Sequence, residues 1–148
     1  TAMIAAGLEA PLAIVDLETT GASPACDRVS EVAVIEVDGF EVSSEWSTLV
    51  NPECAIPSPI QALTGITNDM VAGAPRFRSL AEQLLERLGG RVFVAHNARF
   101  DFSFVNENLR RLDYPPLPGP PGKQAQGVRL VRQVLASQAV THRFRYVR

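Results

Sequence analysis

The sequence predicts an α/β fold in which a mixed central sheet, an antiparallel hairpin plus parallel strands, is flanked by helices. Two observations lead to this prediction. Short apolar runs of strand length alternate along the chain with segments whose leucines recur at helical spacing. The order strand, hairpin, helix, strand, helix is typical of a layered α/β arrangement. A length of 148 residues with 46% hydrophobic content predicts a single domain over residues 1–148.

Three strands are expected in the first third of the chain. Residues 12–17 form a continuous apolar run, which indicates a buried strand. The stretch RVSEVAVIEVDG alternates apolar and polar residues, and FEVSSEWSTLV follows it directly. Asp38-Gly39 lies between these two stretches and is typical of a tight hairpin. The second and third strands should therefore be antiparallel.

Sequence patterns in the middle of the chain predict two helices. The segment NPECAIPSPIQALTGITNDMVAGAP is rich in Pro and Gly, so we expect loops around a short helix at residues 60–63. In FRSLAEQLLERLGG the leucines recur at helical spacing, and Gly89-Gly90 should end the helix. Ser79 and Glu82 have the spacing of a capping box.

Sequence patterns in the rest of the chain, after Gly90, predict a strand and two further helices. The apolar stretch RVFVAH is a short strand, and DFSFVNENLRRLD carries one apolar helical stripe. The stretch YPPLPGPPG is a loop; it contains a P-x-x-P pattern, for which a peptide-ligand role is the alternative. The stretch VRLVRQVLASQ predicts a basic amphipathic helix.

Composition predicts a cytoplasmic protein without a membrane partner. No stretch approaches the length of a membrane span, and the apolar N-terminal residues lack the basic region of a signal peptide. Cys26 and Cys54 are too few for a disulfide framework or a zinc cluster, which fits a reducing compartment.

Charge is distributed unevenly along the chain. All sixteen Asp and Glu residues lie at or before Asp113, whereas the last 35 residues contain six Lys and Arg residues and no acid. Such a chain can hold an acidic centre that binds cations beside a basic edge that attracts phosphate. A solvated helix face is the alternative interpretation.

The stretch AIVDLETTG places two carboxylates at the end of the first predicted strand. Asp16 and Glu18 are two residues apart, so their side chains should point to the same face. Their mutual repulsion is relieved when a cation lies between them. Surface acids on an edge strand are the alternative.

Three stretches resemble successive blocks of a known family. IVDLETTG, NPECAIPSPIQALTGITNDMVAGAPRF and VFVAHNARFDFSFV are similar, in order and spacing, to the DEDD (DEDDh-type) superfamily of 3′-5′ exonucleases. The greatest similarity is to the branch of the epsilon proofreading subunit of bacterial DNA polymerase III. The resemblance implies a ribonuclease H-like fold and a hydrolase that releases nucleoside monophosphates from nucleic-acid 3′ ends.

The resemblance also implies catalytic residues and cofactors. Asp16 and Glu18 match the first motif of the family, and Asp101 matches the second. In this family these carboxylates hold two divalent ions, Mg²⁺ or Mn²⁺, which stabilise the attacking and leaving oxygens of phosphodiester hydrolysis. Asp101 has a structural alternative as the N-cap of the helix that follows it.

Substrate contacts are implied at six further positions. The matching residues are Thr19, Leu63, Thr64, His96, Asn97 and Phe100. Phe100 and Phe102 offer a stacking surface, with the hydrophobic core as the alternative for both. For His96, the alternative to a substrate contact is a structural role with its hydrogen bonds satisfied inside the fold. Neither His96 nor Asn97 is expected to be the catalytic base. The implied partner is the 3′ end of single-stranded DNA, with RNA as the alternative. The resemblance also implies DNA polymerase subunits as protein partners.

The third motif of the family is missing from the sequence. The family requires a fourth acid paired with a histidine general base, yet no Asp or Glu follows Asp113. His142 is a candidate base, although the family's preceding "HR" turn explains it better. We expect either a truncated exonuclease domain or a degenerate one that binds nucleic acid, or docks to a polymerase, without cutting. In both cases the 148 residues should show little or no exonuclease activity.

Overall fold

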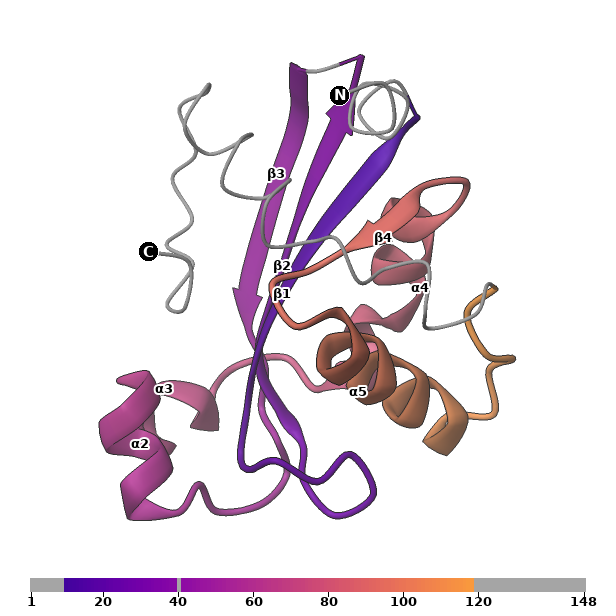
Figure 1. The fold of residues 1–148 in the computed structure, drawn as a ribbon. Helices are drawn as coiled ribbons and strands as arrows, with labels where there is room; N and C mark the ends of the chain where they lie inside the picture. Colours follow the sequence, from indigo (N-terminus) through magenta and orange to yellow (C-terminus); the bar gives the residue numbers. More distant parts are fainter. Residues whose placement is uncertain (1–9, 40, 119–148) are drawn as a thin grey trace.

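A computed structural model describes residues 10–39 and 41–118, in which a four-stranded mixed sheet forms the centre (Figure 1). Its strand order is β3-β2-β1-β4. β1 pairs antiparallel with β2 and parallel with β4, and β2 pairs antiparallel with β3, as predicted. The strands are β1 (Leu12–Thr19), β2 (Val29–Asp38), β3 (Glu41–Leu49) and β4 (Val92–Val94).

The central position of β1 explains why its sequence is a continuous apolar run. All eight residues of β1 are buried, and the strand lies between β2 and β4 inside the sheet. β3 lies at the edge of the sheet, and its residues are exposed or half-buried. Gly39, in the β2–β3 turn, has a φ of 55°, a conformation that glycine adopts without steric cost.

Two long helices pack on the same side of the sheet in Figure 1. They are α4 (Phe77–Leu88) and α5 (Ala98–Arg111). In α4 the buried residues include Leu80, Leu84 and Leu88, the helical stripe expected from the sequence. These leucines belong to one hydrophobic core with β1, β2 and α5. The apolar stripe of each helix therefore fixes its position against the sheet.

The capping box predicted at Ser79 and Glu82 is wrong. α4 begins at Phe77, so both residues lie inside the helix, and its N-cap Arg76 makes no side-chain capping bond. Tertiary contacts hold the residues just before α4, since Asn51 N–H donates to the Pro75 carbonyl and Asn51 forms a parallel bridge with Arg76.

Two short helices form a separate unit, which projects to the lower left in Figure 1. α2 (Ser58–Thr64) contains the short helix predicted at residues 60–63. α3 (Asn68–Ala72) was expected to be loop; it begins with a capping box at Thr67 and Met70. The unit has its own small core of Ile56, Ile66 and Val71.

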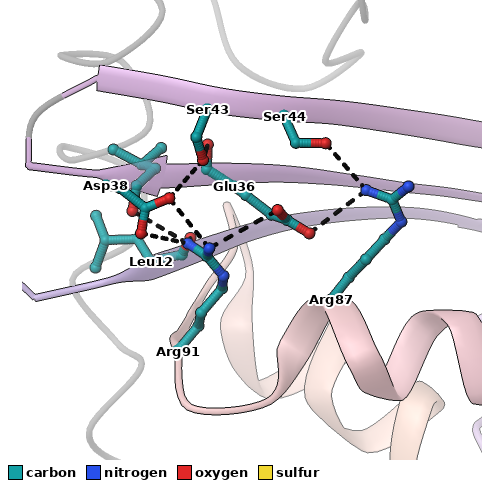
Figure 2. A network of polar contacts seen from close by, with 8 residues as sticks. Leu12, Glu36, Asp38, Ser43, Ser44, Arg87 and Arg91 are labelled. Carbon is teal, nitrogen blue, oxygen red and sulfur yellow. Dashed lines mark hydrogen bonds and ion pairs between the residues drawn. The ribbon is translucent and has the colours of Figure 1, made fainter.

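Two arginines join α4 and the turn after it to the β2–β3 hairpin (Figure 2). Arg91 Nη1 and Nη2 each lie 3.1 Å from an oxygen of Asp38, and Arg91 Nη1 also donates to the carbonyls of Leu12 and Val37. Arg87 Nη1 lies 3.4 Å from Glu36 Oε1. The network fastens the turn end of the hairpin to the helical layer.

The basic helix predicted from VRLVRQVLASQ and the candidate base His142 lie outside the described residues. Within residues 10–39 and 41–118, no helix has the length and apolar character needed to cross a membrane.

Candidate active site

The two carboxylates of the first predicted motif lie near the end of β1. Asp16 is 8% exposed and Glu18 is 3% exposed, so both are buried and not surface acids. β4 pairs only with Leu12–Ile14 of β1, which means that Asp16 and Glu18 lie beyond the last residue paired with β4. The chain leaves β4 at this point and turns into α5.

Asp101 comes to the same place from the first turn of α5. Because α5 begins at Ala98, Asp101 lies inside the helix, and the N-cap alternative is wrong; Asn97 occupies that position. Asp101 is 6% exposed, and its Oδ1 accepts a hydrogen bond of 3.2 Å from Leu17 N–H. The bond joins the two predicted carboxylate motifs directly.

The pKa of Asp101 reflects its burial beside two other carboxyl groups. Burial, followed by the charge of Asp16, raises the pKa of Asp101 to about 8. The hydrogen bond from Leu17 N–H opposes this rise, and the charge of Glu18 adds to it. A carboxyl group in such surroundings keeps its proton near neutral pH unless a positive charge compensates it.

A cavity of about 570 Å³ opens on these carboxylates, a volume typical of small-molecule sites. We name it the acidic cavity. Within the described part of the chain, it is lined by the nine residues predicted for catalysis or substrate binding: Asp16, Glu18, Thr19, Leu63, Thr64, His96, Asn97, Phe100 and Asp101. The structure thus brings together residues from β1, α2, the segment after β4 and α5.

The threonines and leucine of the cavity contribute in different ways. Thr19 Oγ1 donates to the Gly21 carbonyl, and Thr64 Oγ1 donates to the Ile60 carbonyl, so both hydroxyl protons are engaged within the chain. Thr64 Oγ1 also accepts a hydrogen bond of 3.1 Å from Ile66 N–H. Leu63 is 63% exposed and presents apolar surface at the cavity.

The aromatic residues of α5 divide between the cavity and the core. Phe100 is half-buried, lines the cavity and packs against Phe104 with ring centroids 4.7 Å apart. Phe102 is buried and meets Phe93 edge-to-face, so the stacking surface suggested for it is not available. His96 also lines the cavity, and its Nδ1 is buried with no hydrogen-bond partner among the described residues.

Four further residues line the cavity that the sequence reasoning did not assign: Leu17, Gly21, Ala22 and Ile60. Gly21 has a detectable signal, since it ends the stretch DLETTG. A Cβ atom at Gly21 would overlap the Asp27 carboxylate, which is held by Ser23 N–H and the Thr20 hydroxyl. The other three carry no chemical signal in sequence.

The described part of the chain does not contain a complete set of metal ligands. Across residues 10–39 and 41–118, no group of three or more His, Cys, Asp or Glu side chains is arranged closely enough to hold an ion alone. The acidic cavity nevertheless collects three carboxyl groups, and oxygen donors of this kind suit hard divalent cations.

Comparisons with known proteins show which family the chain is similar to. A family model described as Exonuclease (RNase_T) matches residues 13–144. The 3′-5′ exonuclease DinG of Bacillus subtilis is 36% identical over 102 residues, covering 68% of this chain and 11% of the relative. The PolC-type DNA polymerase III of Oceanobacillus iheyensis is 36% identical over 107 residues, covering 72% of this chain and 8% of the relative.

Solved structures show the same fold. Escherichia coli exonuclease I, in complex with an oligonucleotide, superimposes with a TM-score of 0.65 at 23% identity, covering 72% of this chain and 25% of that one. This likeness confirms the predicted ribonuclease H-like fold. The chain spans about a tenth of the length of the two curated relatives.

Proposed function

Because the chain belongs to the RNase_T exonuclease family, we propose that it acts at the 3′ end of single-stranded DNA, where hydrolysis of the terminal phosphodiester would release nucleoside monophosphates. One observation carries the proposal. Asp16 and Glu18 of β1 and Asp101 of α5 converge on one cavity although more than eighty positions separate the two motifs.

We propose that these three carboxylates bind two divalent cations, Mg²⁺ or Mn²⁺. The donor set fits, because it consists of oxygens only and because a nearby positive charge would favour the ionised form of Asp101, whose pKa is raised by burial and by the charge of Asp16. Such cations supply charge that stabilises the attacking and leaving oxygens of a phosphodiester. Mg²⁺ commonly takes some ligands from substrate phosphate, which suits a site that is incomplete without substrate.

The chain's own residues would position the reacting groups. Leu17 N–H orients the Asp101 carboxyl, and the burial of Glu18 limits access of water to its side chain. Thr19, Thr64, His96 and Asn97 are proposed to contact the terminal nucleotide. Leu63 and Phe100 would pack against its base and sugar, since both present apolar surface to the cavity.

The names of the similar proteins indicate a cellular role for the proposed activity. These relatives are named as a 3′-5′ exonuclease and a DNA polymerase III, so we propose a role in DNA proofreading or repair, with polymerase subunits as candidate partners. The two cysteines are free and exposed, which is compatible with a cytoplasmic location.

A non-catalytic domain that binds nucleic acid or docks to a polymerase is the second candidate. The observation that favours it is the absence of any Asp or Glu after Asp113, which leaves the fourth acid of the family unassigned. This candidate shares the acidic cavity with the first and differs only in the chemical step.

Product analysis distinguishes the two functions. A 5′-labelled single strand is incubated with the chain and Mn²⁺ or Mg²⁺, and the shortening of its 3′ end is followed on a denaturing gel. A ladder that Asp16→Asn abolishes supports the exonuclease. Asp113→Asn is the matched control, because Asp113 is exposed, lies outside the cavity and has a φ of 63° that Asn tolerates.

Binding without any ladder, in this chain and in a version extended along its gene, supports the non-catalytic domain. Neither binding nor shortening contradicts both candidates.

A further inference from the structure

A second cavity, of about 330 Å³, opens at the same edge of the sheet as the acidic cavity. We name it the basic pocket. Its polar wall consists of Arg28, Arg78, Arg111, Asn108 and Glu53. Arg28 directly precedes β2, and Glu53 follows β3. Because β1 and β2 are antiparallel and Thr19 pairs with Val29, Arg28 lies at the edge where β1 ends.

Positive charge exceeds negative charge in this pocket. Glu53 is the acid of its wall, and it already lies 3.6 Å from Arg76. Arg28, Arg78 and Arg111 form no ion pair with any residue in the described ranges. The first turn of α4, which contributes Arg78, also carries no acidic residue. An anion in the pocket would therefore meet three guanidinium groups and the positive end of a helix dipole.

One of these guanidinium groups is held rigidly. Arg111 Nη2 donates to the carbonyls of Pro24 and Ala25, each at 2.9 Å, and Nη1 donates to the Asp27 carbonyl at 3.4 Å. Burial, together with the like charge of Arg28, lowers the pKa of Arg111. Carbonyl oxygens orient the guanidinium without neutralising it, so its charge remains available to a ligand.

The basic pocket and the acidic cavity share two structural elements. Asp101 and Asn108 lie seven residues apart on α5 and hence on the same helix face, about 10 Å apart along its axis, with Arg111 about 15 Å from Asp101. The β1–β2 loop contributes Gly21 and Ala22 to the acidic cavity and leads to Arg28 in the basic pocket. The two sites are therefore neighbours on one edge of the molecule.

We propose that the basic pocket binds a backbone phosphate of the same single strand whose 3′ end occupies the acidic cavity. The inference rests on the proposed function, because it takes the ligand of the acidic cavity to be a strand terminus. A stacked strand advances about 3.4 Å per nucleotide, so a separation of 10 to 15 Å corresponds to roughly three or four nucleotides. The pocket should therefore increase the binding affinity of strands that are long enough to reach it, relative to strands that are too short.

The test measures binding of labelled oligothymidylates, a dinucleotide and a strand of about eight nucleotides, in Ca²⁺ and at several salt concentrations. The variant Arg28→Gln/Arg78→Gln removes two charges from the pocket. Arg110→Gln is the control, since Arg110 lies on α5 next to Arg111 but is exposed, pairs with Glu107 and lies outside the pocket. Circular dichroism and thermal unfolding verify that each variant is folded.

The proposal predicts that the double variant binds the longer strand about tenfold more weakly and that its log–log salt dependence is shallower by about 0.7 to 1.4. Binding of the dinucleotide should stay unchanged. An equal loss for both lengths would overturn the proposal, because the pocket would then act through the acidic cavity. A loss no larger than that of Arg110→Gln would also overturn it.

A second measurement separates failure of this proposal from failure of the proposed function. Inorganic phosphate is titrated into the chain while the arginine side-chain Nε–H resonances are recorded by NMR. Shifts confined to Arg28, Arg78 and Arg111, with no strand binding at any length, would overturn both the strand assignment and the proposed function but retain a phosphate site. No shift together with length-independent strand binding would overturn the pocket alone.

Discussion

Leu17 N–H donates a hydrogen bond to Asp101 Oδ1 at 3.2 Å, across 84 positions of sequence. The bond ties the strand that carries Asp16 and Glu18 to the helix that carries Asp101. It also places a third carboxyl group in a buried site beside two others, which makes Asp101 sensitive to both pH and cations.

The first prediction concerns the pH dependence of stability without metal. The pKa of Asp101 is about 8 in the folded chain and about 3.9 when unfolded, so the folded chain binds the additional proton between these values. The contribution of this group to the free energy of unfolding therefore has its full value below about pH 4, and it decreases as the pH rises toward 8. Each unit of raised pKa corresponds to about 1.4 kcal/mol.

Urea unfolding in EDTA across this pH range measures the effect, with Asp101→Asn as the comparison. The difference in unfolding free energy between wild type and variant should decline with rising pH, and Mg²⁺ or Mn²⁺ should reduce the decline because a cation stabilises the ionised carboxylate. Parallel pH profiles for the two proteins would contradict the proton assignment.

Gly21→Ala should destabilise the chain by about 1 to 3 kcal/mol, because the new methyl group would overlap a carboxylate held by two hydrogen bonds. It should also weaken ligand binding, since Gly21 lines the acidic cavity. Chemical denaturation and oligonucleotide titration measure the two effects. Gly73→Ala is the control, as no atom lies near its Cβ position, and a similar loss there would count against the steric explanation.

Arg91→Met should lower the free energy of unfolding by about 1 to 3 kcal/mol, because Arg91 donates to the carbonyls of Leu12 and Val37 in a half-buried position. Arg110→Met serves as the exposed comparison and should cost much less, since Arg110 forms only a surface pair with Glu107. Equilibrium urea unfolding compares the variants. Equal costs would show that the network in Figure 2 does not fasten the hairpin.

Leu63→Ala should change the unfolding free energy by less than about 0.5 kcal/mol, because the side chain is 63% exposed. Dinucleotide affinity should fall by about tenfold, as expected if a base buries some 50 Å² of this apolar surface. Fluorescence titration provides the measurement. Met70→Ala, 47% exposed and outside the cavity, should leave affinity unchanged, and a comparable loss in both variants would argue against a contact at Leu63.

Much of the fold follows from local patterns in the sequence. The apolar run of β1, the Asp38-Gly39 turn and the leucine stripe of α4 are each expressed within about a dozen residues, so sequence alone predicts these elements. The nine site residues came from motif resemblance, and the structure gathers all of them around one cavity. Their individual roles stay predictions.

Tertiary structure decided the features that depend on distant residues. α4 starts at Phe77, directly after the Asn51–Arg76 bridge to a distant segment, and α3 is a helix of only five residues within a segment interpreted as loop. The division between Phe100 at the cavity and Phe102 in the core depends on how α5 meets the sheet. The raised pKa of Asp101 also depends on tertiary structure, because burial and the charge of Asp16 act on this carboxyl group only after β1 and α5 have packed together. Sequence thus determined which chemical groups are available to the cavity, because it fixes the side chains, and packing determined their exposure and their neighbours.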